Sequence, residues 1–226
     1  MNPQTPATEK AKGLSLRLLL TAGLFLAALL LFGLIADEMV LEQEVRFDQM
    51  VFAAVRHLQS PGLTRVMTFI TFFGSHYFLL PAYVLLILWA VIFRRNRTLS
   101  LDITAIGTLG TLIMFSLKSF FHRQRPPDAL VHNVLGFSFP SGHSFSAFTF
   151  YGLLIYILWK QVPPWSYRWP VSILLFLWAA AIAFSRVYLR VHYPSDVVAG
   201  FCLCIVWLGV SFWLLRRLAR HRGRLA

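Results

Sequence analysis

The residues best suited to chemistry are a histidine and a carboxylate four positions apart, His192 and Asp196. At this separation an aspartate can accept a hydrogen bond from one nitrogen of the imidazole and so fix the tautomer of the ring. The other ring nitrogen then keeps its lone pair, which makes it a directed nucleophile. Arg186 and Arg190 precede the pair and are expected to share one helical face. The simpler alternative is a set of interface residues that pair with one another.

A second histidine, His143, follows a turn that suits anion binding. The segment Phe139–Ser144 has the sequence FPSGHS and stands directly before an apolar run. Ser141 or Gly142 can cap the helix that begins here, and the free N–H groups of its first turn then point outward. Such a helix start binds anions, and a glycine lets a phosphate approach the backbone closely. An ordinary turn with a surface histidine would have the same pattern.

A third segment, Lys118–Pro126, is basic and has the sequence KSFFHRQRP. Lys118 and Arg125 are separated by about two helical turns, so they are expected to share a face if the helix continues that far. Pro126 and Pro127 would then end the helix. Taken alone, the segment could simply anchor a helix at a membrane surface.

The composition predicts that these segments lie in a membrane protein. Of the 226 residues, 58% are hydrophobic and 13% are charged, whereas a soluble domain has about 25% charged residues. We expect a single domain over residues 1–226. The net charge of +12 does not predict nucleic-acid binding, because the basic residues fall between apolar runs. Cys202 and Cys204 stand inside an apolar run and are expected to be buried as small hydrophobic residues.

Six apolar stretches have the length and near-absence of charge that a spanning helix needs. Backbone groups cannot stay unpaired in lipid, so each stretch is predicted to be helical. The expected fold class is therefore all-α, a polytopic membrane bundle of about six transmembrane helices. The stretches are Leu18–Ala36, one within Val66–Phe93, Thr98–Phe120, His143–Trp159, Trp169–Arg190 and Ser195–Leu215.

The distribution of Lys and Arg predicts the orientation, because cytoplasmic loops collect positive charge. Both termini, the Arg94–Arg97 turn and the Lys160–Arg168 loop are basic and are assigned to the cytoplasm, with residues 1–13 as a flexible tail. The acidic segment 37–64 is assigned to the extracytoplasmic side, with an amphipathic helix in Phe47–Leu58.

The three candidate segments, all within residues 118–196, then meet on the extracytoplasmic side. Their basic residues have no role in setting topology, and ionisable residues at a membrane edge usually serve function. The sequence therefore predicts an anion-binding site there.

The strings KSFFHRQRP, PSGH and SRVYLRVHYPSD resemble, in order and spacing, the three signature motifs of the PAP2 (type 2 phosphatidic acid phosphatase) superfamily. The resemblance implies a bacterial membrane lipid phosphatase. It implies that His192 attacks phosphorus to form a phosphohistidine, that Asp196 orients His192, and that His143 protonates the leaving oxygen and later helps to activate water. The groups implied to hold the phosphoryl oxygens are Lys118, Arg125, Ser141, Gly142 and Arg186.

No metal and no other cofactor is expected. Magnesium sites rely on carboxylates, and only Asp128 and Asp196 lie near the motifs. The cations already present can supply the electrostatic stabilisation. Arg123 and Arg190 fall outside the family's core positions and are assigned no role.

The expected partner is a membrane lipid in the inner or plasma membrane, with no nucleic acid. The resemblance suggests phosphatidylglycerol phosphate, undecaprenyl pyrophosphate or phosphatidic acid as substrate, with lipid A phosphate a further candidate. The sequence leaves the choice among them open, and the oligomeric state unknown.

Three alternatives use the same residues differently. Vanadium haloperoxidases share these motifs and would hold vanadate on His192, but they are soluble proteins. A lipid phosphotransferase would pass the phosphoryl group to another lipid. A non-catalytic lipid-binding or transport protein would be expected to lack His192 or His143, and both are present.

Overall fold

The computed structural model describes residues 6–131, 135–161 and 165–225. Every regular element in these three ranges is a helix, which confirms the all-α fold class and follows from the need to pair backbone groups internally in lipid. The elements are α1 (Pro6–Ile35), a π-helical segment η1 (Ala36–Leu41), α2 (Arg46–Arg56), α3 (Pro61–Phe72), α4 (His76–Ile92), α5 (Arg97–Phe121), α6 (Gly142–Gln161), α7 (Trp165–Tyr188) and α8 (Pro194–Leu225).

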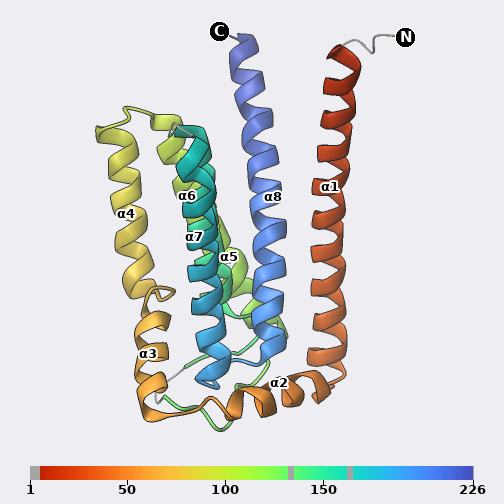
Figure 1. The fold of residues 1–226 in the computed structure, drawn as a ribbon, viewed down its shortest axis with the longest axis vertical. Coiled ribbons are helices and arrows are strands. Elements are labelled where there is room, and N and C mark those ends of the chain that lie inside the picture. Colours follow the sequence, from red (N-terminus) through yellow and green to blue (C-terminus); the bar gives the residue numbers. More distant parts are fainter. Residues whose placement is uncertain (1–5, 132–134, 162–164, 226) are drawn as a thin grey trace.

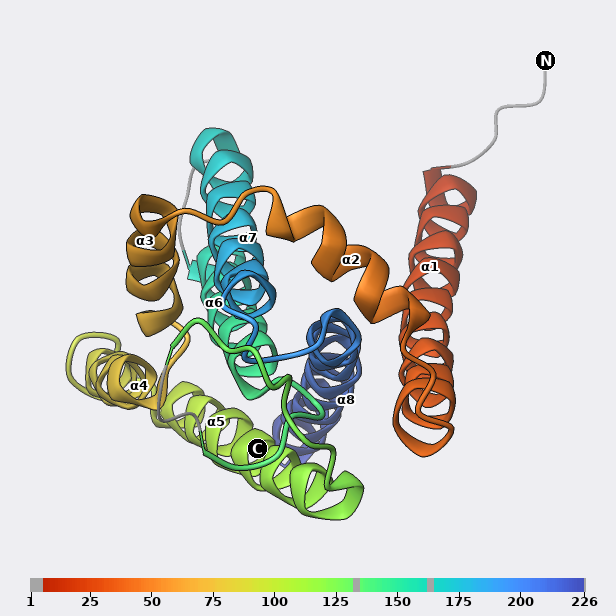
Figure 2. The ribbon, with the colours of Figure 1, turned by 90° about the horizontal axis from the view of Figure 1, so that it is seen from below.

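The long helices run side by side, and α2 lies across one end of the bundle (Figure 1). Seen from that end, α2 passes from the α1 side toward α3 and crosses near α7 and α8 (Figure 2). Helix α1 packs on α8, whereas α6 contacts α4, α5, α7 and α8. Helix α6 is therefore the central element of the bundle.

Among the described residues, five stretches are long and apolar enough to cross a membrane: Leu18–Leu41, Pro61–Ile92, Arg97–Phe121, Ser166–Tyr188 and Pro194–Leu218. Helix α6 is not one of them, although it lies between its neighbours (Figure 1). Its sequence includes several Ser, Thr and Gly residues, and Ser144 and Thr149 are buried. A helix that faces other helices needs less apolar surface than one that faces lipid. Together with α6, the five stretches match the predicted number of about six.

The stretch expected within Val66–Phe93 is divided into α3 and α4. The division falls at Phe73, Gly74 and Ser75, where the backbone makes a turn. A Cβ atom on Gly74 would overlap the side chain of Ile182 and lie 3.4 Å from Cδ2 of His143. The glycine therefore permits a close approach to α6 and α7 at the division between the two helices.

The first helix begins earlier than the sequence predicts. Residues 1–13 were expected to form a flexible tail, but α1 is helical from Pro6 onward, and residues 1–5 lie outside the described residues. Proline is favoured at the first position of a helix. The residues after it include Ala, Glu and Lys, which are strong helix formers. These preferences account for the earlier start.

A helix also forms where the sequence predicts an amphipathic one, at α2. Its inner face packs Val51, Phe52 and Val55 against the end of α7, while Met50 on the other face is exposed. Asp48 shares the inner face and is only 1% exposed. A buried carboxylate is not a feature of a simple surface helix.

Candidate active site

Three segments that are far apart in the sequence meet at the end of the bundle crossed by α2. They are the connection after α5, the start of α6, and the connection from α7 to α8. Backbone hydrogen bonds join them: Ser138 N–H donates to the carbonyl of Arg123 at 2.7 Å, and Ser141 N–H donates to the carbonyl of Asp196 at 3.0 Å. These bonds hold the three segments together through their main chains.

His192 lies in the connection between α7 and α8 and is 1% exposed. Its Nδ1 lies 3.4 Å from Oδ2 of Asp196, and its Nε2 lies 3.2 Å from Nη1 of Arg125. Because a guanidinium can only donate, Nε2 must present its lone pair and Nδ1 must hold the proton. This is the tautomer that the spacing of His192 and Asp196 predicts.

Asp196 is fully buried and has a partner on each side of its carboxylate. Oδ2 accepts a short hydrogen bond from the hydroxyl of Ser138 and a second bond, at 2.9 Å, from the N–H of Tyr193. Oδ1 accepts from Nη1 of Arg123 at 2.7 Å. The Ser138 hydroxyl is also 3.4 Å from Nδ1 of His192.

Ser138 was missed in the sequence, because a serine beside a Pro-Ser-Gly turn has no distinguishing signal. It lies between the carboxylate and the imidazole. It therefore helps to hold both groups in place.

Lys118 and Arg125 hold the chain that leads to α6. Nζ of Lys118 donates to the carbonyls of Phe137 at 2.7 Å and Ser138 at 3.3 Å. Arg125 donates from Nε to Gly136 O at 2.9 Å, and its Nη1 and Nη2 donate to the carbonyls of Val191 and Leu135.

The two cations would share a helical face only if α5 continued to Arg125, and it does not. Helix α5 ends at Phe121, and His122 has a left-handed backbone with φ of 50°. The connection after α5, rather than the helix, brings Arg125 back toward Lys118.

Arg186 is buried at the end of α7, with 5% of its surface exposed. Its Nη1 donates to the hydroxyl of Thr71 on α3 at 2.8 Å, whereas its buried Nε has no hydrogen-bond partner among the described residues. A buried donor without a partner is unfavourable, so Nε is able to donate to an acceptor that binds beside it.

Arg190 does not share a helical face with Arg186, contrary to expectation. Helix α7 ends at Tyr188, and Arg190 has a φ of 54°. Its side chain pairs with Asp128 at 3.2 Å and lies 4.8 Å from the ring centroid of Phe52. These contacts point it away from the other site cations.

The start of α6 has the expected cap. Ser141 Oγ accepts from the N–H of Ser144 at 3.4 Å, and the Ser141 carbonyl accepts from Phe145 N–H at 3.0 Å. A Cβ on Gly142 would lie 3.6 Å from Cε of Lys118, so the cation is next to the helix start. A Cβ on Gly200 of α8 would lie 2.7 Å from the Ser141 carbonyl oxygen, so this close approach requires glycine.

Positive charge concentrates around the two histidines. His143 interacts electrostatically with Arg186, His192, Arg125 and Lys118. Burial, and then the charges of Arg186, Lys118 and Arg125, lower the pKa of His192 well below its usual range. His192 is therefore neutral near pH 7, with a lone pair on Nε2. The structure thus brings all the residues selected from the sequence to one end of the bundle.

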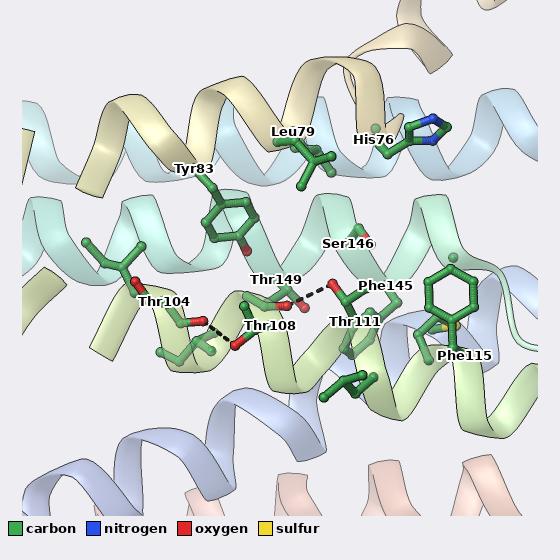
Figure 3. Close-up of a pocket in the computed structure, with 18 of the residues that line it drawn as sticks. His76, Leu79, Tyr83, Thr104, Thr108, Thr111, Phe115, Phe145, Ser146 and Thr149 are labelled. Atoms are coloured by element: carbon green, nitrogen blue, oxygen red, sulfur yellow. Dashed lines mark hydrogen bonds between the residues drawn. The ribbon is translucent and has the colours of Figure 1, made fainter. Parts of the chain in front are cut away.

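An elongated cavity of about 880 Å³ opens between α4, α5 and α6 beside these residues. Lys118, Gly142 and His143 line one end, and Ile103 lines the other. Figure 3 shows Tyr83 of α4 pointing toward α5 and α6. At 1.5 Å per helical residue the cavity follows α5 for about 22 Å from Lys118 to Ile103. Most of the residues that line it are apolar.

Within the described ranges, no group of three or more His, Cys, Asp or Glu residues is placed to hold a metal ion. The charged side chains nearest to the histidines are instead mainly cationic.

The sequence matches known proteins across this site. The profile of the PAP2 superfamily matches residues 99–220. Phosphatidylglycerophosphatase B of Bacillus subtilis is 36% identical over 157 residues, which cover 69% of this chain and 77% of that protein. An undecaprenyl-diphosphatase of Sulfolobus acidocaldarius is 29% identical over 169 residues, covering 72% and 75% respectively.

Solved structures share the fold. The transmembrane PAP2-type phosphatidylglycerolphosphate phosphatase from Bacillus subtilis superposes with a TM-score of 0.73 at 31% identity, covering 89% of this chain and 96% of that chain. LpxE from Aquifex aeolicus superposes with a TM-score of 0.56 at 28% identity, covering 73% and 93%.

Proposed function

The chain belongs to the PAP2 superfamily of membrane lipid phosphatases, and from this premise we propose that it dephosphorylates a lipid phosphate or lipid pyrophosphate through a phosphohistidine on His192. One observation carries the proposal. A neutral imidazole, whose Nε2 lone pair accepts from Arg125, lies among three cations, beside an apolar cavity that extends along the spanning helices. The first part suits phosphoryl transfer, and the second suits a lipid tail.

In the first step, Nε2 of His192 attacks phosphorus and a P–N bond forms. The bond from phosphorus to the leaving oxygen breaks; this oxygen belongs to the lipid in a monophosphate and to the lipid phosphate in a pyrophosphate. It takes a proton from His143, which is protonated when the anionic substrate is bound. The imidazole becomes positively charged as it is phosphorylated. Asp196, which accepts from Nδ1–H, stabilises this charge.

In the second step, water attacks the phosphohistidine. His143, now neutral, takes a proton from the water, the P–N bond breaks and inorganic phosphate leaves. His143 is thereby protonated again and His192 is neutral, so the enzyme returns to its starting state. No metal takes part in this scheme.

The phosphoryl oxygens are held by Lys118, Arg125 and Arg186, with Ser141 and the N–H of Gly142 at the start of α6. Arg125 donates to Nε2 of His192, but a phosphoryl oxygen is the stronger acceptor. A bound substrate therefore draws the guanidinium onto the phosphate and exposes the lone pair. The unpartnered Nε of Arg186 supplies a further donor.

The apolar cavity accommodates the lipid part of the substrate. Its length of about 22 Å approaches the roughly 30 Å of a bilayer's hydrocarbon core. Long-chain candidates are phosphatidylglycerol phosphate, undecaprenyl pyrophosphate and phosphatidic acid. The names of the two curated relatives favour the first two.

The site faces the extracytoplasmic side of the inner or plasma membrane, and both termini are cytoplasmic. Support comes from the start of α1, the α4–α5 connection and the end of α8, which all lie at the end opposite α2 (Figure 1). The last two contain basic residues that favour the cytoplasm: Arg94, Arg95, Arg97, Arg216 and Arg217.

The test is phosphate release by detergent-solubilised protein in the presence of EDTA, comparing wild type with His192→Ala. We expect wild-type turnover to survive EDTA and the substitution to abolish turnover. Activity in the variant would reject the nucleophile, and loss with EDTA would reject the metal-free scheme. A panel of the three lipids, compared by kcat/KM, identifies the preferred substrate. A phosphorylated lipid acceptor in place of free phosphate would indicate a phosphotransferase.

A further inference from the structure

Helix α2 carries a carboxylate into the interior, next to the proposed active site. Asp48 is 1% exposed and accepts three hydrogen bonds. Its Oδ1 accepts from Ser195 N–H at 2.8 Å, and its Oδ2 accepts from the Ser195 hydroxyl and from Nη2 of Arg123, each at 2.8 Å. Ser195 belongs to the first turn of α8, directly before Asp196. Asp48 therefore contacts the turn that presents the partner of His192.

Arg123 connects the two carboxylates. Its Nη1 donates to Oδ1 of Asp196 at 2.7 Å and to the hydroxyl of Ser195 at 2.8 Å, while its Nη2 binds Asp48. The guanidinium also lies 4.0 Å from the ring centroid of Tyr193. With these contacts on several sides, Arg123 has little freedom to leave Asp196.

The charges of Arg123, Asp196 and Asp48 explain how a second carboxylate strengthens the interaction between Asp196 and the imidazole. An arginine paired with Asp196 alone would neutralise it and weaken its interaction with the imidazole. With Asp48 included, two carboxylates share one guanidinium, and the cluster has a net charge of −1 when both carboxylates are ionised. Asp196 can then stabilise the positive charge that His192 gains when its Nε2 is phosphorylated.

We propose that Asp48 is a positioning residue for His192, acting through Arg123 and Asp196, and that α2 is thereby part of the active site. The proposal rests on the function proposed above for His192. It gives Asp48 two effects: it orients the first turn of α8, and it preserves the negative charge of Asp196 toward the imidazole.

The key variant is Asp48→Asn, which retains the side-chain shape and one acceptor oxygen for Ser195 but removes the charge. Asp128→Asn is the matched control, because Asp128 pairs with Arg190 and its side chain is 68% exposed. We expect Asp48→Asn to lower kcat about 10- to 100-fold, the usual range for partners of a catalytic ligand. The KM and the melting temperature of Asp48→Asn in detergent should stay near the wild-type values. For Asp128→Asn, kcat, KM and the melting temperature should all stay near wild type.

A double variant tests the route through Arg123. If Asp48 acts through this arginine, Asp48→Asn should reduce kcat far less in an Arg123→Gln background than in wild type. Equal reductions of kcat in both backgrounds would show that Asp48 does not act through Arg123.

Further outcomes separate this inference from the proposed function. Turnover by His192→Ala would reject the proposed function itself. If His192→Ala is inactive while Asp48→Asn matches Asp128→Asn, only the role of Asp48 is rejected. A loss of activity in Asp48→Asn that parallels a loss of melting temperature would show a structural role alone and would also reject the inference.

Discussion

Nη1 of Arg125 lies 3.2 Å from Nε2 of His192 and donates to the nitrogen proposed to attack phosphorus. The same guanidinium is anchored to backbone carbonyls on both sides of the site, including those of Gly136 and Val191. Arg125 therefore favours the tautomer with its proton on Nδ1. After burial and the charges of Arg186 and Lys118, its own charge further lowers the pKa of His192. The predictions below begin with this pair.

Replacing Arg125 should change the pH dependence of the reaction. The reactive imidazole is neutral, so kcat/KM falls as the pH drops through the pKa of His192. Burial and the three cations lower this pKa, so the wild-type fall should lie below the usual histidine range of about 6.5. Arg125→Gln removes one cation, and the pKa of His192 should rise and shift the fall to higher pH.

The same substitution should lower kcat/KM by about 10²- to 10³-fold, the typical effect of removing one donor to a reacting group. Arg190→Gln is the control, because Arg190 faces Asp128 and Phe52 rather than His192. An unchanged pH profile in Arg125→Gln would show that the arginine does not influence His192.

The role of His143 can be isolated with an activated substrate. His143→Ala should slow turnover of a lipid phosphate by about 10²- to 10⁴-fold, the range for general acid–base catalysis. A nitrophenyl phosphate needs no protonation of its leaving group. For this substrate the variant should release nitrophenol in a rapid burst and then turn over slowly, because water is still poorly activated. Absence of a burst at stoichiometric enzyme would argue against a phosphoenzyme that His143 helps to hydrolyse.

Gly200 should be intolerant of a side chain. A Cβ there would lie 2.7 Å from the Ser141 carbonyl oxygen and 3.0 Å from Cβ of Ser144. Gly200→Ala should therefore separate α8 from the start of α6, destabilise the protein by about 1–3 kcal/mol and reduce activity. Gly33→Ala is the control, since a Cβ there meets no atom within 4 Å. Equal melting temperatures for the two variants would contradict the prediction.

Filling the cavity should discriminate between substrates by tail length. Thr111 lines the cavity, and Thr111→Trp should raise KM for a long-chain lipid phosphate while leaving a water-soluble phosphate monoester unaffected. Leu101→Trp is the control on the same helix, because Leu101 is 62% exposed and does not line the cavity. Equal effects of Thr111→Trp on both substrates would show that the tail binds elsewhere.

The helices could be predicted from the sequence because the hydropathy of each stretch is a local property. The sequence also predicted that the three polar segments lie on the same side of the membrane, because successive spanning helices run in opposite directions. The third stretch ends where the sequence predicts, near Phe120, but it does not continue to Arg125, and the helix expected to hold both Arg186 and Arg190 ends at Tyr188. Both helices are followed by left-handed residues, His122 and Arg190, neither of which is a glycine that would signal a turn.

The partners of Asp196 could not be predicted from local patterns. Asp48 lies 75 positions from the arginine that it pairs with, and nothing in a surface helix distinguishes a buried carboxylate from a solvated one. The hydroxyl of Ser138 lies 58 positions from Asp196. Contacts of this kind depend on how the helices pack, which hydropathy and spacing do not specify.

The modest hydropathy of α6 has a consequence for biogenesis. A segment with several hydroxyl side chains partitions from the translocon into lipid less readily than its neighbours do. Helix α6 contacts α7 and α8, which are synthesised after it. We therefore expect α6 to complete its insertion only when those two helices emerge and shield its polar side chains. In a nascent chain that is truncated before α7, α6 should not insert fully, and His143 at its start should not reach its place in the site.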